Sequence, residues 1–131
     1  MVAEKKLNPV FLLEKKTNDL DWKNLSQTDI QDLDEQIIST VASLKTEEGK
    51  WDSFQMNRLE SVLDVIGNSW EKVPGAVQIA KLLYAYYQHR IAKAGEVYAT
   101  RKAEGKTTSI DYSSHWTAKA AVINQKYLSN E

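Results

Sequence analysis

The stretch PGAVQIAKLLYAYYQHRIAKAGEVYATRKAE, residues 74–104, decides the fold of this chain. Apolar residues recur along it at alternating steps of three and four: Val77, Ala80, Tyr84, Tyr87, Ile91, Ala94 and Tyr98. Such steps place side chains on one face of an α-helix. Pro74 suits the first turn of a helix, and a helix over 74–104 measures roughly 45 Å. We therefore expect one long helix at the centre of the molecule.

Shorter helices are expected before and after this stretch. Capping residues or a proline at the first helical position predict four further helix starts. These starts are Asn8-Pro9, Thr28 with Gln31 as a capping box, Asp52, and Ser113 or Ser114. The helix that begins at Pro9 is short and is expected to end at Asp19.

Each expected helix after the N-terminal one carries an apolar face at helical spacing. The second is expected to bury Ile30, Leu33, Ile37, Val41 and Leu44. The third is expected to bury Phe54, Leu59, Val62, Leu63 and Ile66. The last is expected to bury Tyr112, Trp116, Ala120, Ile123 and Tyr127. The sequence thus predicts an all-α fold, a compact bundle of four helices plus a short N-terminal helix, in a single domain over 1–131.

The composition excludes several classes of protein. With 131 residues and a net charge of −1, the chain has the size of one domain and no global excess of positive charge. It contains no cysteine, which excludes disulfide scaffolds and thiolate zinc sites. No apolar window of about 18 residues is present to span a membrane. We therefore expect a cytoplasmic protein that does not enter a membrane.

Catalytic and metal-binding patterns are also missing from the sequence. The two histidines, His89 and His115, are 26 residues apart and lack the short spacing of metal ligands. Ser113 and Ser114 precede His115 directly, and neighbours in a helix do not face each other. We expect no catalytic residue, no metal and no cofactor, and hence a protein that is not an enzyme.

Charge is distributed unevenly along the chain. Residues 1–75 hold 9 basic and 14 acidic side chains, a balance of −5, whereas residues 76–131 hold 8 basic and 4 acidic, a balance of +4. Four acids, Asp29, Asp32, Asp34 and Glu35, crowd the start of the second expected helix. Negative charge is favourable there because it complements the helix dipole. We interpret this cluster as a helix start and the overall asymmetry as attraction between helices.

The leading functional hypothesis is a non-enzymatic protein-interaction module that acts through helical surfaces. It would be an adaptor, an inhibitor or a subunit of a small homo-oligomer, and its partner would be another protein or a second copy. Tryptophan and tyrosine often anchor protein interfaces. Trp51 and Trp70 flank expected helix ends, and Tyr86 is the best candidate for an exposed ring on the long helix, so these three are the expected partner-binding residues.

The alternative hypothesis is a nucleic-acid-binding helical protein. Basic residues along the long helix and its following link could contact phosphates, with tyrosines interleaved among them. The expected contacts are Arg90, Lys93, Arg101, Lys102 and Lys106. No recognised nucleic-acid motif accompanies them.

Overall fold

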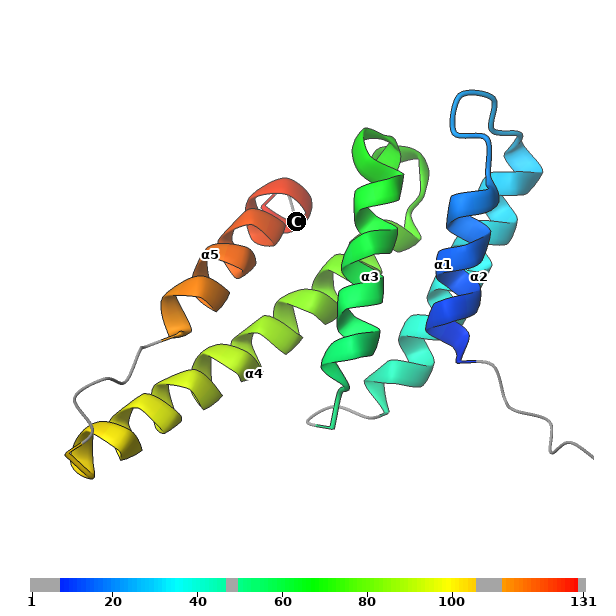
Figure 1. Cartoon of the computed structure of the whole chain (residues 1–131). Helices are drawn as coiled ribbons and strands as arrows, with labels where there is room; N and C mark the ends of the chain where they lie inside the picture. Colours follow the sequence, from blue (N-terminus) through cyan, green and yellow to red (C-terminus); the bar gives the residue numbers. More distant parts are fainter. Residues whose placement is uncertain (1–7, 47–49, 106–111, 130–131) are drawn as a thin grey trace, which may run out of the picture. The chain divides into compact units, whose positions relative to one another are not determined.

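The computed structural model describes residues 8–46, 50–105 and 112–129, and 84% of these residues are helical (Figure 1). The described residues form five α-helices: α1 (Pro9–Asp19), α2 (Gln27–Lys45), α3 (Ser53–Ile66), α4 (Gly75–Ala103) and α5 (Ser113–Ile123). A 3-10 helix, η1 (Gly67–Lys72), follows α3, and one π-helical turn, η2 (Asn124–Leu128), follows α5. No strand occurs in the described part of the chain, so the predicted all-α class is confirmed.

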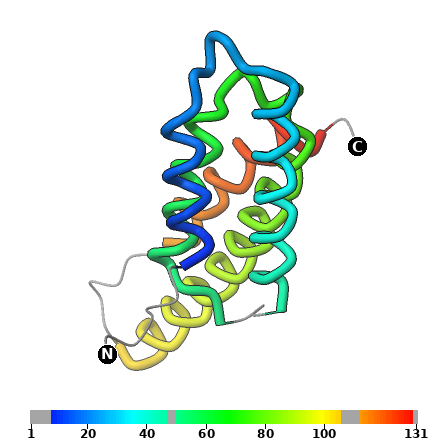
Figure 2. The backbone as a smooth tube through the Cα atoms, turned by 90° about the vertical axis from the view of Figure 1, so that its right-hand side faces the viewer, coloured from blue at the N-terminus to red at the C-terminus, as the bar shows by residue number. Residues whose placement is uncertain are grey.

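The chain divides into two compact units within α4, residues 1–79 and residues 80–131. In the first unit, α1 packs against both α2 and α3, which the two views in Figures 1 and 2 also show. In the second unit, α5 packs on α4 through aromatic rings. The single domain expected over 1–131 stays a prediction.

Two of the predicted helix starts are confirmed with their caps. The Asn8 side chain accepts a hydrogen bond of 2.9 Å from the Val10 amide, and Pro9 is the first residue of α1. Asp52 accepts one of 2.9 Å from the Phe54 amide at the start of α3. Each side-chain oxygen satisfies an amide that has no partner inside its helix.

The predicted capping box at Thr28 is wrong, because α2 begins two residues earlier. Ser26 Oγ accepts a hydrogen bond of 3.0 Å from the Asp29 amide, and the Asp29 carboxylate accepts one of 3.3 Å from the Ser26 amide. A carboxylate in this reciprocal pair also complements the helix dipole, which the neutral Gln31 cannot do. The start predicted at Ser113 or Ser114 shifts as well, because Tyr112 occupies the N-cap position of α5.

The core of the first unit lies between α1, α2 and α3. Its buried apolar side chains from these helices are Val10, Leu13, Leu33, Ile37, Val41, Leu44, Met56, Leu59, Val62, Leu63 and Ile66. The predicted stripe of α2 is confirmed from Leu33 to Leu44. The buried face of α3 starts at Met56 and not at Phe54, which is 51% exposed. Two residues along a helix turn by about 200°, so Phe54 and Met56 cannot share a face.

The first residue of α4, Gly75, packs closely against α2. The Gly75 amide donates a hydrogen bond to Asp34 Oδ1. A Cβ atom at position 75 would lie 2.7 Å from Asp34 Oδ1 and 2.8 Å from Ile37 Cγ2. Only glycine leaves room for this approach. The carboxylate at the N-terminus of α4 complements the helix dipole.

Burial along α4 corrects the predicted stripe. Ala80 and Tyr87 are buried as expected, but Tyr84 and Ile91 are only half-buried. Tyr86, expected to be exposed, is 4% exposed, so that prediction is wrong. The ring of Tyr86 packs edge to face against Trp116, with centroids 5.9 Å apart. The sequence pattern along α4 alone could not reveal this contact from α5.

Candidate functional site

Of the three residues predicted to bind a partner, Trp51 and Tyr86 make contacts within the fold. Trp51 is half-buried, and its indole N–H donates a hydrogen bond of 2.7 Å to the Leu44 carbonyl, which ties the start of α3 to the end of α2. Trp70 is half-buried in η1, and Tyr86 is buried against Trp116. Partner binding by these residues stays a prediction.

The basic residues predicted to contact nucleic acid lie on the exposed half of α4. Arg90, Lys93, Arg101 and Lys102 are exposed, whereas Lys106 lies outside the described residues. Arg90, Lys93 and Arg101 line one groove between α4 and α5, and Lys102 is not among its lining residues. The helical period explains why Lys102 differs. Lys93 and Arg101 are eight residues apart, a little over two turns, whereas Lys102 is nine residues from Lys93, which is two and a half turns and places it on the opposite side of the helix.

This groove belongs entirely to the second unit. It has a volume of about 460 Å³ and is lined by Arg90, Lys93, Ala94, Val97, Arg101, Tyr112, His115 and Trp116. We call it the cationic groove. The wall from α4 supplies the charges and small apolar side chains, and the residues at the start of α5 supply three rings.

The ring of Trp116, in the α5 wall of the groove, is contacted by two cationic side chains and by a histidine ring. The Arg90 guanidinium lies 4.9 Å from the centroid of its ring, and Lys119 Nζ lies 5.5 Å away. The His115 ring lies edge to face, 5.1 Å from it. Cation–π and edge-to-face contacts of this kind orient an indole without covering it fully, and Trp116 stays half-buried.

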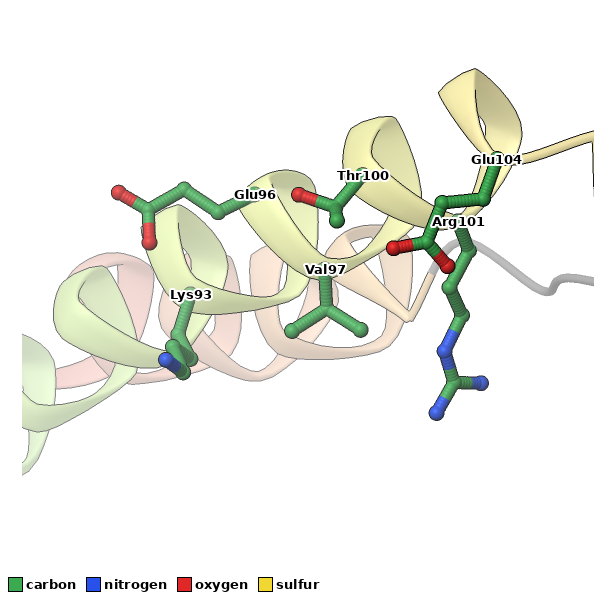
Figure 3. Close-up of a pocket in the computed structure, with 6 residues that line it drawn as sticks. All are labelled: Lys93, Glu96, Val97, Thr100, Arg101 and Glu104. Atoms are coloured by element: carbon green, nitrogen blue, oxygen red, sulfur yellow. The ribbon is translucent and has the colours of Figure 1, made fainter.

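The lining of the groove has one sign of charge. Of the described residues that line it, none is acidic. A neighbouring shallow pocket of about 310 Å³ shares Lys93, Val97 and Arg101 with the groove but adds Glu96 and Glu104 (Figure 3). In Figure 3, Lys93, Val97 and Arg101 point to one side of α4, whereas Glu96 points to another. Glu96 therefore points away from the groove, whereas Glu104 lines the adjoining pocket together with Arg101.

A second candidate surface lies on the first unit, where α1 packs on α3. Phe11 is 38% and Phe54 is 51% exposed, and their rings meet edge to face with centroids 5.6 Å apart. The Arg58 guanidinium lies 5.3 Å from the Phe11 centroid and 4.8 Å from the Phe54 centroid. Arg58 also forms an ion pair of 2.9 Å with Glu14. We call Phe11, Phe54 and Arg58 the aromatic surface.

Phe54, Tyr112 and Trp116 are not predicted as site residues from the sequence, for different reasons. Phe54 was assigned to the core, although its position two residues before Met56 already turns it away from the buried face. Tyr112 and Trp116 were assigned to one buried stripe, yet Tyr112 is 57% exposed. The gathering of the α4 cations with the rings of α5 leaves no signal in the sequence, because the two sets come from different helices.

The described residues contain no group of three or more His, Asp or Glu side chains that could hold a metal ion. Of the acids at the start of α2, Asp29 forms the capping box and Asp34 accepts from Gly75. Among the described helices, none is both long and apolar enough to cross a membrane.

Comparison of the chain with protein-family models, with curated proteins and with solved structures finds no match.

Proposed function

We propose that this chain is a non-enzymatic interaction module that binds another protein through the aromatic surface of its first unit. The observation that carries the proposal is the exposure of Phe11 and Phe54 from two different helices under one shared guanidinium. Two adjacent exposed rings form an apolar patch, and burying such a patch against a partner is favourable. Aromatic side chains and arginine are also the residue types enriched in protein interfaces.

The aromatic surface is organised before any partner arrives. The ion pair with Glu14 fixes Arg58 over both rings, and the edge-to-face contact fixes the rings against each other. Side chains that are already ordered lose less conformational entropy on binding. Phenyl rings supply contact area and no proton transfer, which suits a binding role more than a catalytic one. We place the module in the cytoplasm, as the cysteine-free composition favours.

The test compares Phe54→Ala with Ile38→Ala. Ile38 is 50% exposed on α2 and lies outside the aromatic surface, so it controls for loss of any exposed apolar side chain. Each tagged variant is used for capture from the native source after nuclease treatment at moderate salt. We expect the wild-type chain and Ile38→Ala to retain the same protein in a stoichiometric ratio. Phe54→Ala should retain at least about tenfold less, as for a hot-spot residue.

Two outcomes would contradict this proposal. Equal recovery of the partner by Phe54→Ala and Ile38→Ala would exclude the aromatic surface as the docking site. Recovery of the bait alone, with a solution mass that falls from dimer to monomer in Phe54→Ala, would show that the occupant is a second copy and not another protein. Circular dichroism of each variant checks that the helices are intact.

A further inference from the structure

We propose that the cationic groove of the second unit binds single-stranded nucleic acid. This activity is separate from the proposed protein contact, because the groove and the aromatic surface share no residue and lie on different units. The argument rests on the charge of the groove, its length along α4 and the rings of its second wall.

The charges along α4 suit a chain of phosphates. Arg90, Lys93 and Arg101 line one side of the groove, and no described lining residue carries the opposite charge. From Arg90 to Arg101 the helix rises by about 16 Å, which spans several stacked nucleotides at about 3.4 Å each. Two of the three cations are arginines, whose planar fork donates two hydrogen bonds to one phosphate.

The rings at the start of α5 suit unpaired bases. Tyr112 is 57% exposed and His115 is exposed, and both line the groove opposite the cations. Aromatic side chains stack on the faces of bases without regard to sequence, and a groove with cations along it follows the backbone. In a duplex the base faces are stacked inside the helix, so the rings select a single strand.

The small apolar side chains of the α4 wall favour a nucleic acid over an acidic peptide. Ala94 and Val97 present small apolar side chains between Lys93 and Arg101, and a flat base can lie across them. A peptide carboxylate would neutralise the cations but would leave the tyrosine and histidine rings exposed to water. Cations on one wall and rings on the other match a single strand, whose phosphates lie along one side and whose bases lie along the other.

The test is a fluorescence anisotropy titration of the full chain with a labelled oligothymidylate of about 20 nucleotides at about 50 mM salt. We expect saturable binding. The logarithm of the binding constant should fall linearly with the logarithm of the salt concentration, with a slope near −2 for three phosphate contacts. Arg101→Gln should weaken binding and reduce the magnitude of the slope by about 0.7. Lys126→Gln, an equal loss of charge outside the groove, should leave both the affinity and the slope near wild type.

A second pair of variants isolates stacking from charge. Tyr112→Ala should weaken binding about tenfold because it removes a stacking ring, and Tyr112→Phe, which keeps the ring, should bind as the wild type does. Tyr112 is exposed at the edge of α5, so neither change disturbs the core. Phe54→Ala should bind the oligonucleotide normally, which separates failure here from failure of the protein contact.

Three results would overturn the proposal. The first is a titration that does not saturate. The second is an equal effect of Arg101→Gln and Lys126→Gln, which would reduce the binding to diffuse attraction. The third is that polyglutamate competes as well as unlabelled oligonucleotide does when both are present at the same concentration of negative charge. That result would assign the groove to an acidic protein segment. A duplex of the same length should compete poorly.

Discussion

The two halves of α4 have the same helical backbone and opposite surroundings. From Gly75 to Tyr87, eight residues are buried, among them Ile79, Leu83 and Tyr87; from Gln88 to Ala103 every residue is exposed or half-buried. The first half therefore contributes to cores, while the second presents Arg90, Lys93 and Arg101 to solvent. One helix thus combines an anchored segment with an exposed cationic segment. The predictions below test this division, from the largest expected effect to the smallest.

Replacing a tyrosine in each half should have unequal effects on stability. Tyr87 is 1% exposed and contacts Trp116, so Tyr87→Ala leaves a cavity and should lower the free energy of unfolding by about 3–4 kcal/mol. Tyr98 is half-buried in the second half, so Tyr98→Ala should cost less than half as much. Urea denaturation followed by circular dichroism measures both. Equal losses would show that the second half is anchored as firmly as the first.

The two glycines of α4 should respond to alanine with opposite signs. In the first half, Gly75→Ala places a Cβ atom 2.7 Å from Asp34 Oδ1 and should lower the free energy of unfolding by about 1–3 kcal/mol through overpacking. The same denaturation experiment measures this loss. A variant as stable as the wild type would mean that α2 and α4 move apart at no cost.

The glycine of the second half should give the smallest effect. A Cβ atom at Gly95 meets nothing within 4 Å, so Gly95→Ala adds helix propensity without a clash. We expect an increase of about 0.5–1 kcal/mol and a rise of about 3 °C in the melting temperature. Scanning calorimetry of Gly95→Ala beside Gly75→Ala gives a matched pair. A destabilised Gly95→Ala would indicate that this glycine has a role in packing.

Local features of the fold were predictable because they depend on neighbours in sequence. Asn8-Pro9 and Asp52 were predicted as helix starts, and the structure has them with the expected caps. The start of α2 was placed at Thr28 instead of Ser26, because two patterns of the same type overlap there. Choosing between them required the reciprocal contact with Asp29.

The candidate sites were only partly predictable. The cations of α4 were identified as a basic face, since charge and helical spacing are visible in the sequence. The rings that share the groove with these cations were not identified. Tyr112 and Trp116 lie at the start of α5, which is a separate helix, and the sequence does not show that it packs beside the cations. Tyr86 was expected to be exposed because it lies off the predicted apolar stripe of α4. The contact with Trp116 buries it.

By itself the sequence determined the all-α class, the long helix and the position of its positive charges. These follow from the period of apolar residues, from helix caps and from the scarcity of glycine and proline, which act over a few residues. Only the tertiary structure decided which side chains are buried, which cations share a groove with rings, and why residue 75 must be glycine. Those properties depend on distances between segments far apart in the chain, and helical periodicity carries no information about them.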